Sequence, residues 1–171
     1  LETNPPLIMW IYLIPVWLGR LIDVPPLIVF PFLVSLLNVI SIGLVAGIMR
    51  GQSFLGEKPV FQAILLYIAF GFFLLSPAVY GQRELLLFSL VLPYLIKSLG
   101  DDDNNKKSFL NIVIMTMAAV GFAIKPFFLL LWGMNELCTV VQKRKITKIF
   151  AWHNWFIGLV QVAYFAAIYF F

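Results

Sequence analysis

Charged residues are scarce in this sequence, which carries 12 basic and 8 acidic residues over 171 positions. Only 12% of its residues are charged and 62% are hydrophobic, whereas a typical soluble domain has about 25% charged residues. A water-soluble fold of this size could not bury so much apolar surface, so we expect the excess to face lipid. The same composition excludes intrinsic disorder, because disordered segments contain few hydrophobic residues.

Cysteine and histidine are almost absent. Cys138 is the single cysteine, which excludes a disulfide or a cysteine metal cluster within these residues. We interpret it as a small packing residue. His153 is the single histidine, and we expect it to lie at a membrane interface beside Trp152 and Trp155. The sequence contains no phosphate-binding glycine loop, no nucleophile elbow and no metalloprotease helix, so no motif of a soluble enzyme is present.

Long apolar runs dominate what remains. A membrane-spanning helix needs about 20 mostly apolar residues. The run at residues 7–18 is too short and contains Pro15, and its aromatic residues Trp10, Tyr12 and Trp17 suit the headgroup region, so it predicts an interfacial helix. The longer runs predict six transmembrane helices, at residues 25–49, 60–80, 84–99, 108–124, 126–141 and 154–171.

The predicted fold is therefore all-α: an integral membrane helical bundle of about six transmembrane helices preceded by one short interfacial helix. We expect one domain over residues 1–171, with an interfacial outer segment at 1–24 and transmembrane helices at 25–171. The chain starts at Leu1 and stops inside an apolar run at Phe171. We therefore expect it to be a fragment of a longer chain.

The distribution of basic residues predicts the orientation in the membrane. Loops 50–58, 97–107 and 142–153 hold most of the lysines and arginines, and the positive-inside rule places them in the cytoplasm. The opposite segments hold one basic residue each, namely Arg20, Arg83 and Lys125. The orientation of the chain in the membrane thus explains its net positive charge, and no nucleic-acid partner is needed to explain it. Within the spans, we expect Glu136 to pair with a basic loop residue, and Ser35, Asn38 and Ser41 to bond across helices.

The predicted outer turns are short yet carry charged groups, Arg83 and Glu84 in one and Lys125 in another. A charge at the centre of a span costs about 2.5–3.5 kcal/mol, so charges at its ends need water or partners. Arg and Lys suit a phosphate or pyrophosphate group, and Glu84 in a first helical turn suits the helix dipole. An alternative also stands: Arg83 and Glu84 form a local ion pair, and Lys125 extends to the interface.

Three neutral or acidic residues extend this candidate site. Gln82 adds a donor and an acceptor in the same turn as Arg83. Glu2 and Asn4 open the interfacial helix and are predicted on the same outer side. Ordinary turn and helix-start chemistry would also explain these three residues.

Three stretches together resemble GT-C-type glycosyltransferases. They are residues 2–10 (ETNPPLIMW), 81–84 (GQRE) and 123–128 (AIKPFF), which occur in the order seen in a bacterial GT-C-like branch. The resemblance implies a polyprenyl-phosphate-linked sugar donor, transfer on the non-cytoplasmic face and inversion at the anomeric carbon. It also implies a bacterial inner-membrane location with membrane lipid and the lipid-linked donor as partners.

The sequence departs from the family pattern at three points. The family's acidic residue, which acts as base or holds a divalent metal, would lie before Leu1, so no catalytic residue or metal ligand is assigned in this chain. Leu85 stands where the branch has His, and Asn4 stands where the family has Lys. The resemblance therefore leaves Arg83 and Lys125 as the expected contacts of the donor phosphate, with Gln82, Glu84, Asn4 and Glu2 around them.

Two other functions stay open. One is a transporter or flippase of lipid-linked saccharides, in which the same charges guide a phosphate group. Transporters place polar sites near the membrane midplane on broken helices, and Pro77 and Pro93 would suit such breaks. The other is a non-catalytic membrane assembly subunit. The charges at one outer edge favour the glycosyltransferase.

Overall fold

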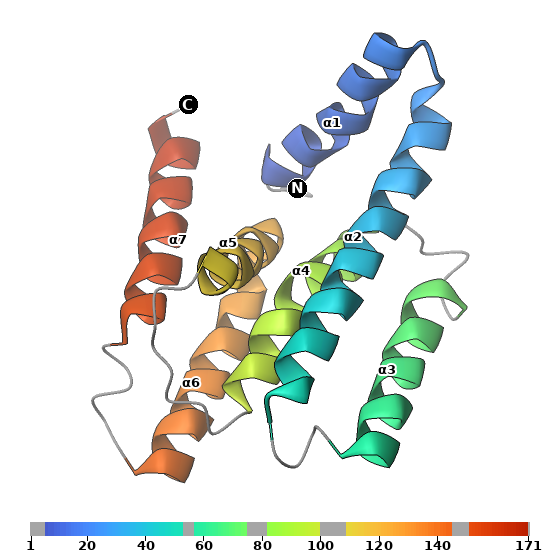
Figure 1. Cartoon of the computed structure of the whole chain (residues 1–171). Helices are drawn as coiled ribbons and strands as arrows, with labels where there is room; N and C mark the ends of the chain where they lie inside the picture. Colours follow the sequence, from blue (N-terminus) through green and yellow to red (C-terminus); the bar gives the residue numbers. More distant parts are fainter. Residues whose placement is uncertain (1–5, 53–56, 75–81, 100–108, 145–150, 171) are drawn as a thin grey trace.

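The computed structural model describes residues 6–52, 57–74, 82–99, 109–144 and 151–170, without the side chains of residues 142 and 143. Every regular element in this part of the chain is a helix, which confirms the all-α prediction (Figure 1). In chain order the elements are α1 (Pro6–Ile22), α2 (Pro26–Arg50), α3 (Lys58–Phe73), α4 (Arg83–Ser98), α5 (Phe109–Ile124), the 3-10 helix η2 (Pro126–Phe128), α6 (Leu129–Lys143) and α7 (Trp152–Phe170).

One described helix, rather than the six predicted, is both long and apolar enough to cross a membrane by itself. This helix is α2, whose 25 residues rise about 37 Å at 1.5 Å per residue. The helices α1, α3 and α5 have 17, 16 and 16 residues, which rise only about 24–26 Å against a hydrocarbon core of about 30 Å. The predicted run at 60–80 passes beyond the described part of α3.

The helix α1 is longer than predicted: it ends at Ile22, whereas the predicted interfacial helix ends at residue 18. The chain leaves α1 at Asp23, which has φ 54°, in the left-handed region. Val24 N–H then donates to the Gly19 carbonyl at 2.9 Å. A Cβ at Gly19 would lie 2.6 Å from the Val24 carbonyl oxygen, so only glycine permits this turn. Pro26 then starts α2, a position that proline favours.

The helices α1, α3 and α4 pack around α2. The helix α1 folds back on the first half of α2, with Tyr12 and Phe30 in an edge-to-face contact at 5.4 Å between ring centroids. The helix α3 lies beside the second half (Figure 1), where the Arg50 guanidinium is 5.6 Å from the centre of the Phe61 ring. A seam of buried residues on α2, spaced by three or four positions, consists of Val34, Asn38, Ser41 and Val45, and Asn38 in this seam contacts Ser89 of α4.

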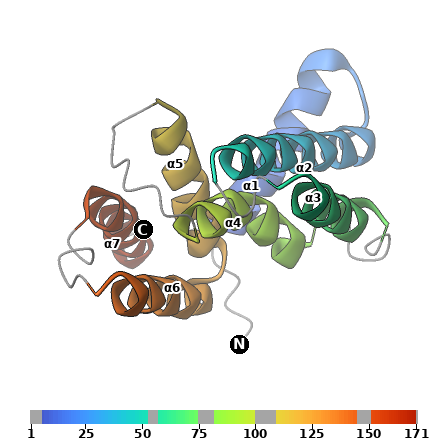
Figure 2. The ribbon, with the colours of Figure 1, turned by 60° about the horizontal axis from the view of Figure 1, so that its bottom comes forward.

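The helix α5 crosses α4 instead of running beside it, as Figures 1 and 2 together show. Small residues permit this close crossing. A Cβ at Gly121 would lie 2.6 Å from Val91 Cγ2 and 3.0 Å from Leu90 Cβ. Ala118 and Ala119 beside it are fully buried. The crossing brings the end of α5 near the start of α4, which is the arrangement on which the candidate site depends.

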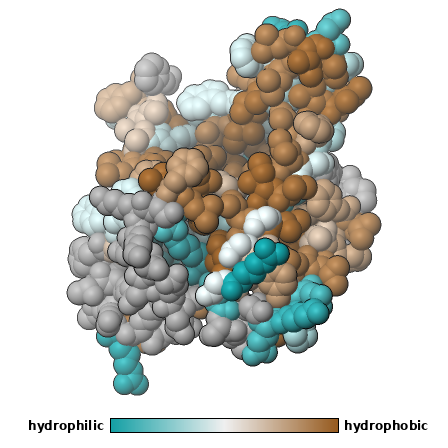
Figure 3. Space-filling model, viewed as in Figure 1, coloured by the Kyte–Doolittle hydropathy of each residue, from teal (hydrophilic) through white to brown (hydrophobic). Residues whose placement is uncertain are grey.

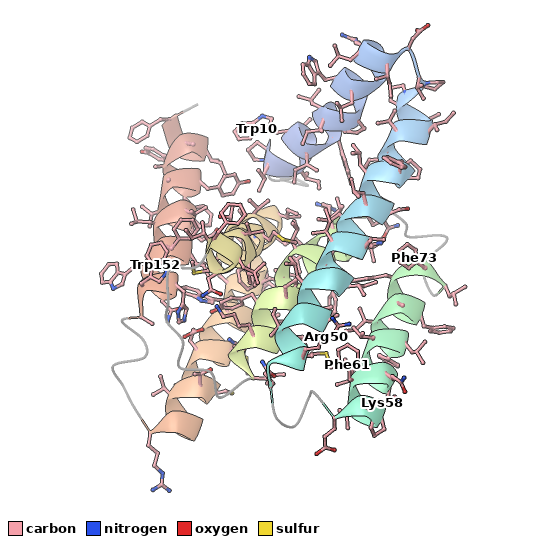
Figure 4. The ribbon with its side chains drawn as sticks, in the orientation of Figure 1. Trp10, Arg50, Lys58, Phe61, Phe73 and Trp152 are labelled. Carbon is pink, nitrogen blue, oxygen red and sulfur yellow. The ribbon has the colours of Figure 1, made fainter. Side chains whose placement is uncertain are left out.

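The C-terminal ends of α2, α4 and α6 and the start of α3 lie toward the same side of the molecule, at the bottom of Figure 1. Gln52 Nε2 just after α2 donates to the Ile96 carbonyl of α4 at 3.3 Å. Lys97 Nζ donates to Asn111 Oδ1 of α5 at 2.5 Å. Figure 4 shows Arg50 and Lys58 on this side too. The fold therefore gathers basic helix ends on one side.

Candidate functional site

The charged residues predicted at the outer turns lie where α4 begins and α5 ends. Gln82 has an extended conformation and precedes α4, so Arg83 and Glu84 form its first turn. Lys125 has an extended conformation (φ −136°, ψ 97°) between α5 and η2, and Pro126 begins the 3-10 helix. Although 41 residues separate Glu84 from Lys125 in the sequence, the crossing of α5 over α4 joins their two turns.

Lys125 Nζ forms a hydrogen-bonded ion pair with the Glu84 carboxylate. The Glu84 side chain is 54% exposed and the Lys125 side chain 32% exposed, so water screens the pair. Arg83 adjoins it and is half-buried. Tyr12 of α1 lies within electrostatic reach of both Arg83 and Glu84. We call Arg83, Glu84 and Lys125 the mouth; together they carry one net positive charge.

The structure joins some of the predicted site residues and leaves others undescribed. It pairs Glu84 of α4 with Lys125 of the α5–η2 turn, a contact that the local alternative did not include. Gln82 is exposed beside Arg83. Glu2 and Asn4 lie outside the described residues. The mouth therefore consists of residues from α4 and from the α5–η2 turn, with α1 close by.

A second polar site lies further along α4 and surrounds the carboxylate of Glu136. Tyr94 of α4 donates its hydroxyl to Glu136 Oε1 at 2.5 Å. Asn154 of α7 donates its amide to Glu136 Oε2 at 2.7 Å, and His153 Nε2 is 3.6 Å from the same oxygen. We call Glu136, Tyr94, His153 and Asn154 the Glu136 centre. It joins three helices, α4, α6 and α7.

The Glu136 centre is buried and well supplied with hydrogen bonds. The exposed fractions of Glu136, Tyr94 and Asn154 are 8%, 5% and 7%. Trp132 Nε1 donates to Asn154 Oδ1 at 3.2 Å, which orients the amide toward the carboxylate. The Tyr94 ring packs edge-on against His153 at 6.3 Å between centroids. Since both carboxylate oxygens have donors at hydrogen-bonding distance, the centre can hold a negative charge away from water.

The Glu136 centre was harder to predict from the sequence than the mouth. The sequence predicts that Glu136 pairs with a basic loop residue, and among the described residues its partners are His153, at the end of the predicted loop 142–153, and Tyr94, Asn154 and Asn135. The interfacial position of His153 stays a prediction, and the structure adds that its ring lies against Glu136 and Tyr94. The available signal was an acidic residue inside an apolar run, which in a membrane protein is by default a functional candidate.

Among the described residues, no group of three or more His, Cys, Asp or Glu side chains could hold a metal ion. No protein-family model matches the sequence, and no curated protein or solved structure is significantly similar to it. The likeness to GT-C enzymes therefore stays a prediction that depends on the three motifs.

Proposed function

We propose that the chain is the membrane part of a GT-C-like glycosyltransferase, which transfers a sugar from a polyprenyl-phosphate-linked donor on the non-cytoplasmic face. The observation that carries this proposal is the mouth, where charged residues from two distant turns meet. Its net positive charge suits the phosphate of such a donor. The motif resemblance points to the same chemistry.

The proposal includes a membrane-embedded fold of about six transmembrane helices, with α1 at the interface. Large apolar side chains supply its support, because they are exposed over most helices; Leu27, Leu66 and Val162 are 86%, 71% and 67% exposed. Figure 3 shows this apolar surface over α1 and the first half of α2. The basic helix ends on one side suit the cytoplasmic face of a bacterial inner membrane, with loops 50–58, 97–107 and 142–153 in the cytoplasm.

Each residue of the mouth has a role in this proposal. Arg83 binds two phosphate oxygens through its planar guanidinium, and Lys125 adds a point charge. The two cations stabilise the negative charge that develops on the leaving phosphate, and such electrostatic stabilisation is usually the largest catalytic contribution. Glu84 holds Lys125 in position until the phosphate arrives. No described residue is assigned as the base that activates the acceptor hydroxyl.

The test replaces Arg83 and Lys125 by Gln, one at a time, in the complete protein in its membrane. We expect sugar transfer from a polyprenyl-phosphate donor to fall by about 100-fold for each variant, the usual scale for loss of one stabilising donor, while expression persists. Lys58→Gln is the matched control, because it removes a charge from the other side of the molecule (Figure 4). Unchanged transfer by either mouth variant would reject that residue's role and leave a non-catalytic assembly subunit as the better explanation.

A transporter or flippase of lipid-linked saccharides is the second candidate. Polar residues are buried well inside helices, at Asn38 in α2, Ser89 in α4 and Glu136 in α6, and Pro93 lies inside α4. Transporters place their polar sites in this way. Reconstituted vesicles separate the two functions, since a flippase moves the lipid-linked saccharide across the bilayer without breaking its sugar–phosphate bond.

A further inference from the structure

A layer of polar residues interrupts the apolar seam between α2 and α4. It consists of Asn38 and Ser41 on α2 and Ser89 on α4, whose exposed fractions are 0%, 0% and 1%. Val34 and Val45 flank the layer on α2 and are equally buried. Polar groups buried this deeply normally have hydrogen-bond partners. Each hydrogen-bond donor and acceptor of this layer is therefore expected to have a partner.

The Ser89 hydroxyl makes two contacts but has one proton. Its oxygen lies 2.5 Å from the amide group of Asn38 and 2.8 Å from the Leu85 carbonyl. If the proton goes to Leu85, Asn38 must present its NH₂ to Ser89, and its amide oxygen is left over. If the proton goes to Asn38, the Asn38 NH₂ is left over. An asparagine amide fits either way round, and in both orientations one end of it has no partner.

Two more groups of the layer can take a further hydrogen bond. The Ser41 hydroxyl has no hydrogen-bond partner among the described residues. Pro93 lies four residues after Ser89 inside α4 and has no N–H, so the Ser89 carbonyl loses the helical hydrogen bond that it would otherwise accept. The layer thus combines one end of an amide, one hydroxyl and one carbonyl, which contribute both donors and acceptors.

We propose that this layer binds one internal water molecule, which bridges Asn38 and Ser41 of α2 to the Ser89 carbonyl of α4. A buried water typically makes about three hydrogen bonds to groups of this kind, and in membranes ordered waters satisfy carbonyls freed by proline. A water molecule both donates and accepts, so it suits either orientation of the Asn38 amide. The layer contains no carboxylate, so a cation there would lack a counter-charge.

This water site is separate from the mouth. Ser89 follows Glu84 by five residues, which places the layer about 7.5 Å further along α4. Neither Arg83 nor Lys125 contributes to it. The water site forms whether or not the mouth binds a lipid phosphate, because its hydrogen-bonding groups all belong to α2 and α4 at the seam.

The test is water-edited solid-state NMR of the complete protein in lipid bilayers. We expect magnetisation from water to reach the Asn38 side chain strongly, as it reaches the exposed Gln82 side chain, and to reach the backbone amide of buried Val45 only weakly. Ser41→Ala removes one partner with little change of volume, and we expect the water signal at Asn38 to be lost or sharply reduced. In Pro93→Ala the restored N–H takes the Ser89 carbonyl, and we expect the same direction of change.

Two outcomes would overturn the proposal. The first is an Asn38 side chain as dry as Val45 in the unaltered protein. The second is a thermal unfolding temperature that rises in sodium chloride compared with choline chloride, with the rise abolished by Ser41→Ala, because the occupant would then be a cation. Comparing Ser41→Ala with Thr116→Ala, an exposed hydroxyl on α5 that bonds its own helix, separates the site from a general effect of removing a hydroxyl.

Discussion

The mouth and the Glu136 centre each contain one carboxylate, and α4 contributes to both, yet the two sites differ in exposure. The Glu84 side chain is 54% exposed and pairs with a lysine. The Glu136 side chain is 11% exposed, and its described partners are mostly neutral. An exposed ion pair contributes at most about 1 kcal/mol to stability, whereas loss of one partner in a buried network costs several times more.

This difference in exposure indicates that the charged groups of the two sites have different roles. Because the exposed Glu84–Lys125 pair contributes little to stability, our proposal lets Lys125 exchange Glu84 for an anionic ligand at little cost to the fold. The Glu136 centre holds α6 and α7 against α4, so its polar groups are committed to the fold. Variants at the two sites, and at the helix crossing that joins Lys125 to Glu84, test this division directly.

Glu136→Ala should have the largest effect on stability. It leaves the buried Tyr94 hydroxyl and Asn154 amide without their acceptor, so we expect a loss of about 3 kcal/mol in the free energy of unfolding. Denaturant titration in mixed micelles measures it. Glu84→Ala is the matched control at the mouth and should cost less than about 1 kcal/mol. Equal losses for the two variants would contradict the division between the sites.

Gly121→Leu should lower the free energy of unfolding by about 2 kcal/mol, because a larger side chain at the α4–α5 crossing forces packed atoms apart. Gly43→Leu is the control, since nothing lies within 4 Å of a Cβ at Gly43, and it should have little effect. The measurement is thermal unfolding in the same micelles. If the two glycine variants behave alike, the close crossing that joins Lys125 to Glu84 is not present.

Tyr94→Phe removes one hydroxyl from the Glu136 centre and keeps the ring. We expect a loss of about 1.5 kcal/mol, the lower range for a hydrogen bond to a charged group. The double variant with Glu136→Ala shows whether the two residues interact: its loss should fall well below the sum of the single losses. Additive losses would mean that Tyr94 and Glu136 stabilise the protein independently.

Lys125→Gln should have the smallest effect on stability, below about 1 kcal/mol, because the pair with Glu84 is exposed. Salt should remove even this difference, since the screening length falls to about 3 Å at 1 M. Unfolding at low and high salt measures the effect. A loss that persists at high salt would show that the Lys125–Glu84 pair is as buried as the Glu136 centre.

Much of the secondary structure could be predicted from the sequence. Apolar runs between polar turns located the described helices, because a helix that is apolar on all its faces appears in the sequence as a continuous apolar run. The end of α1 was misplaced, since the left-handed conformation of Asp23 and the carbonyl close to Gly19 depend on how α1 packs against α2. The number of transmembrane helices was overestimated, since α2 alone among the described helices is long and apolar enough to span a membrane.

The residues of the candidate sites could be predicted in part, but their contacts could not. Arg83, Glu84 and Lys125 were recognisable because charges next to apolar runs stand out in a sequence. Their pairing was not, because it depends on the crossing of α5 over α4. The Glu136 centre was even harder to predict. It consists of single polar residues from three helices, and no local sequence pattern encodes how these helices are placed relative to one another.

By itself, the sequence determined an all-helical chain, the positions of its helices and the uneven placement of its charges. These properties follow from local preferences and from hydrophobicity, which act over a few residues. The tertiary structure alone decided that Lys125 meets Glu84, that Glu136 meets Tyr94 and Asn154, and that Asn38 faces Ser89. Such contacts depend on side-chain volumes at helix crossings, where a glycine in place of a leucine lets two helices approach closely.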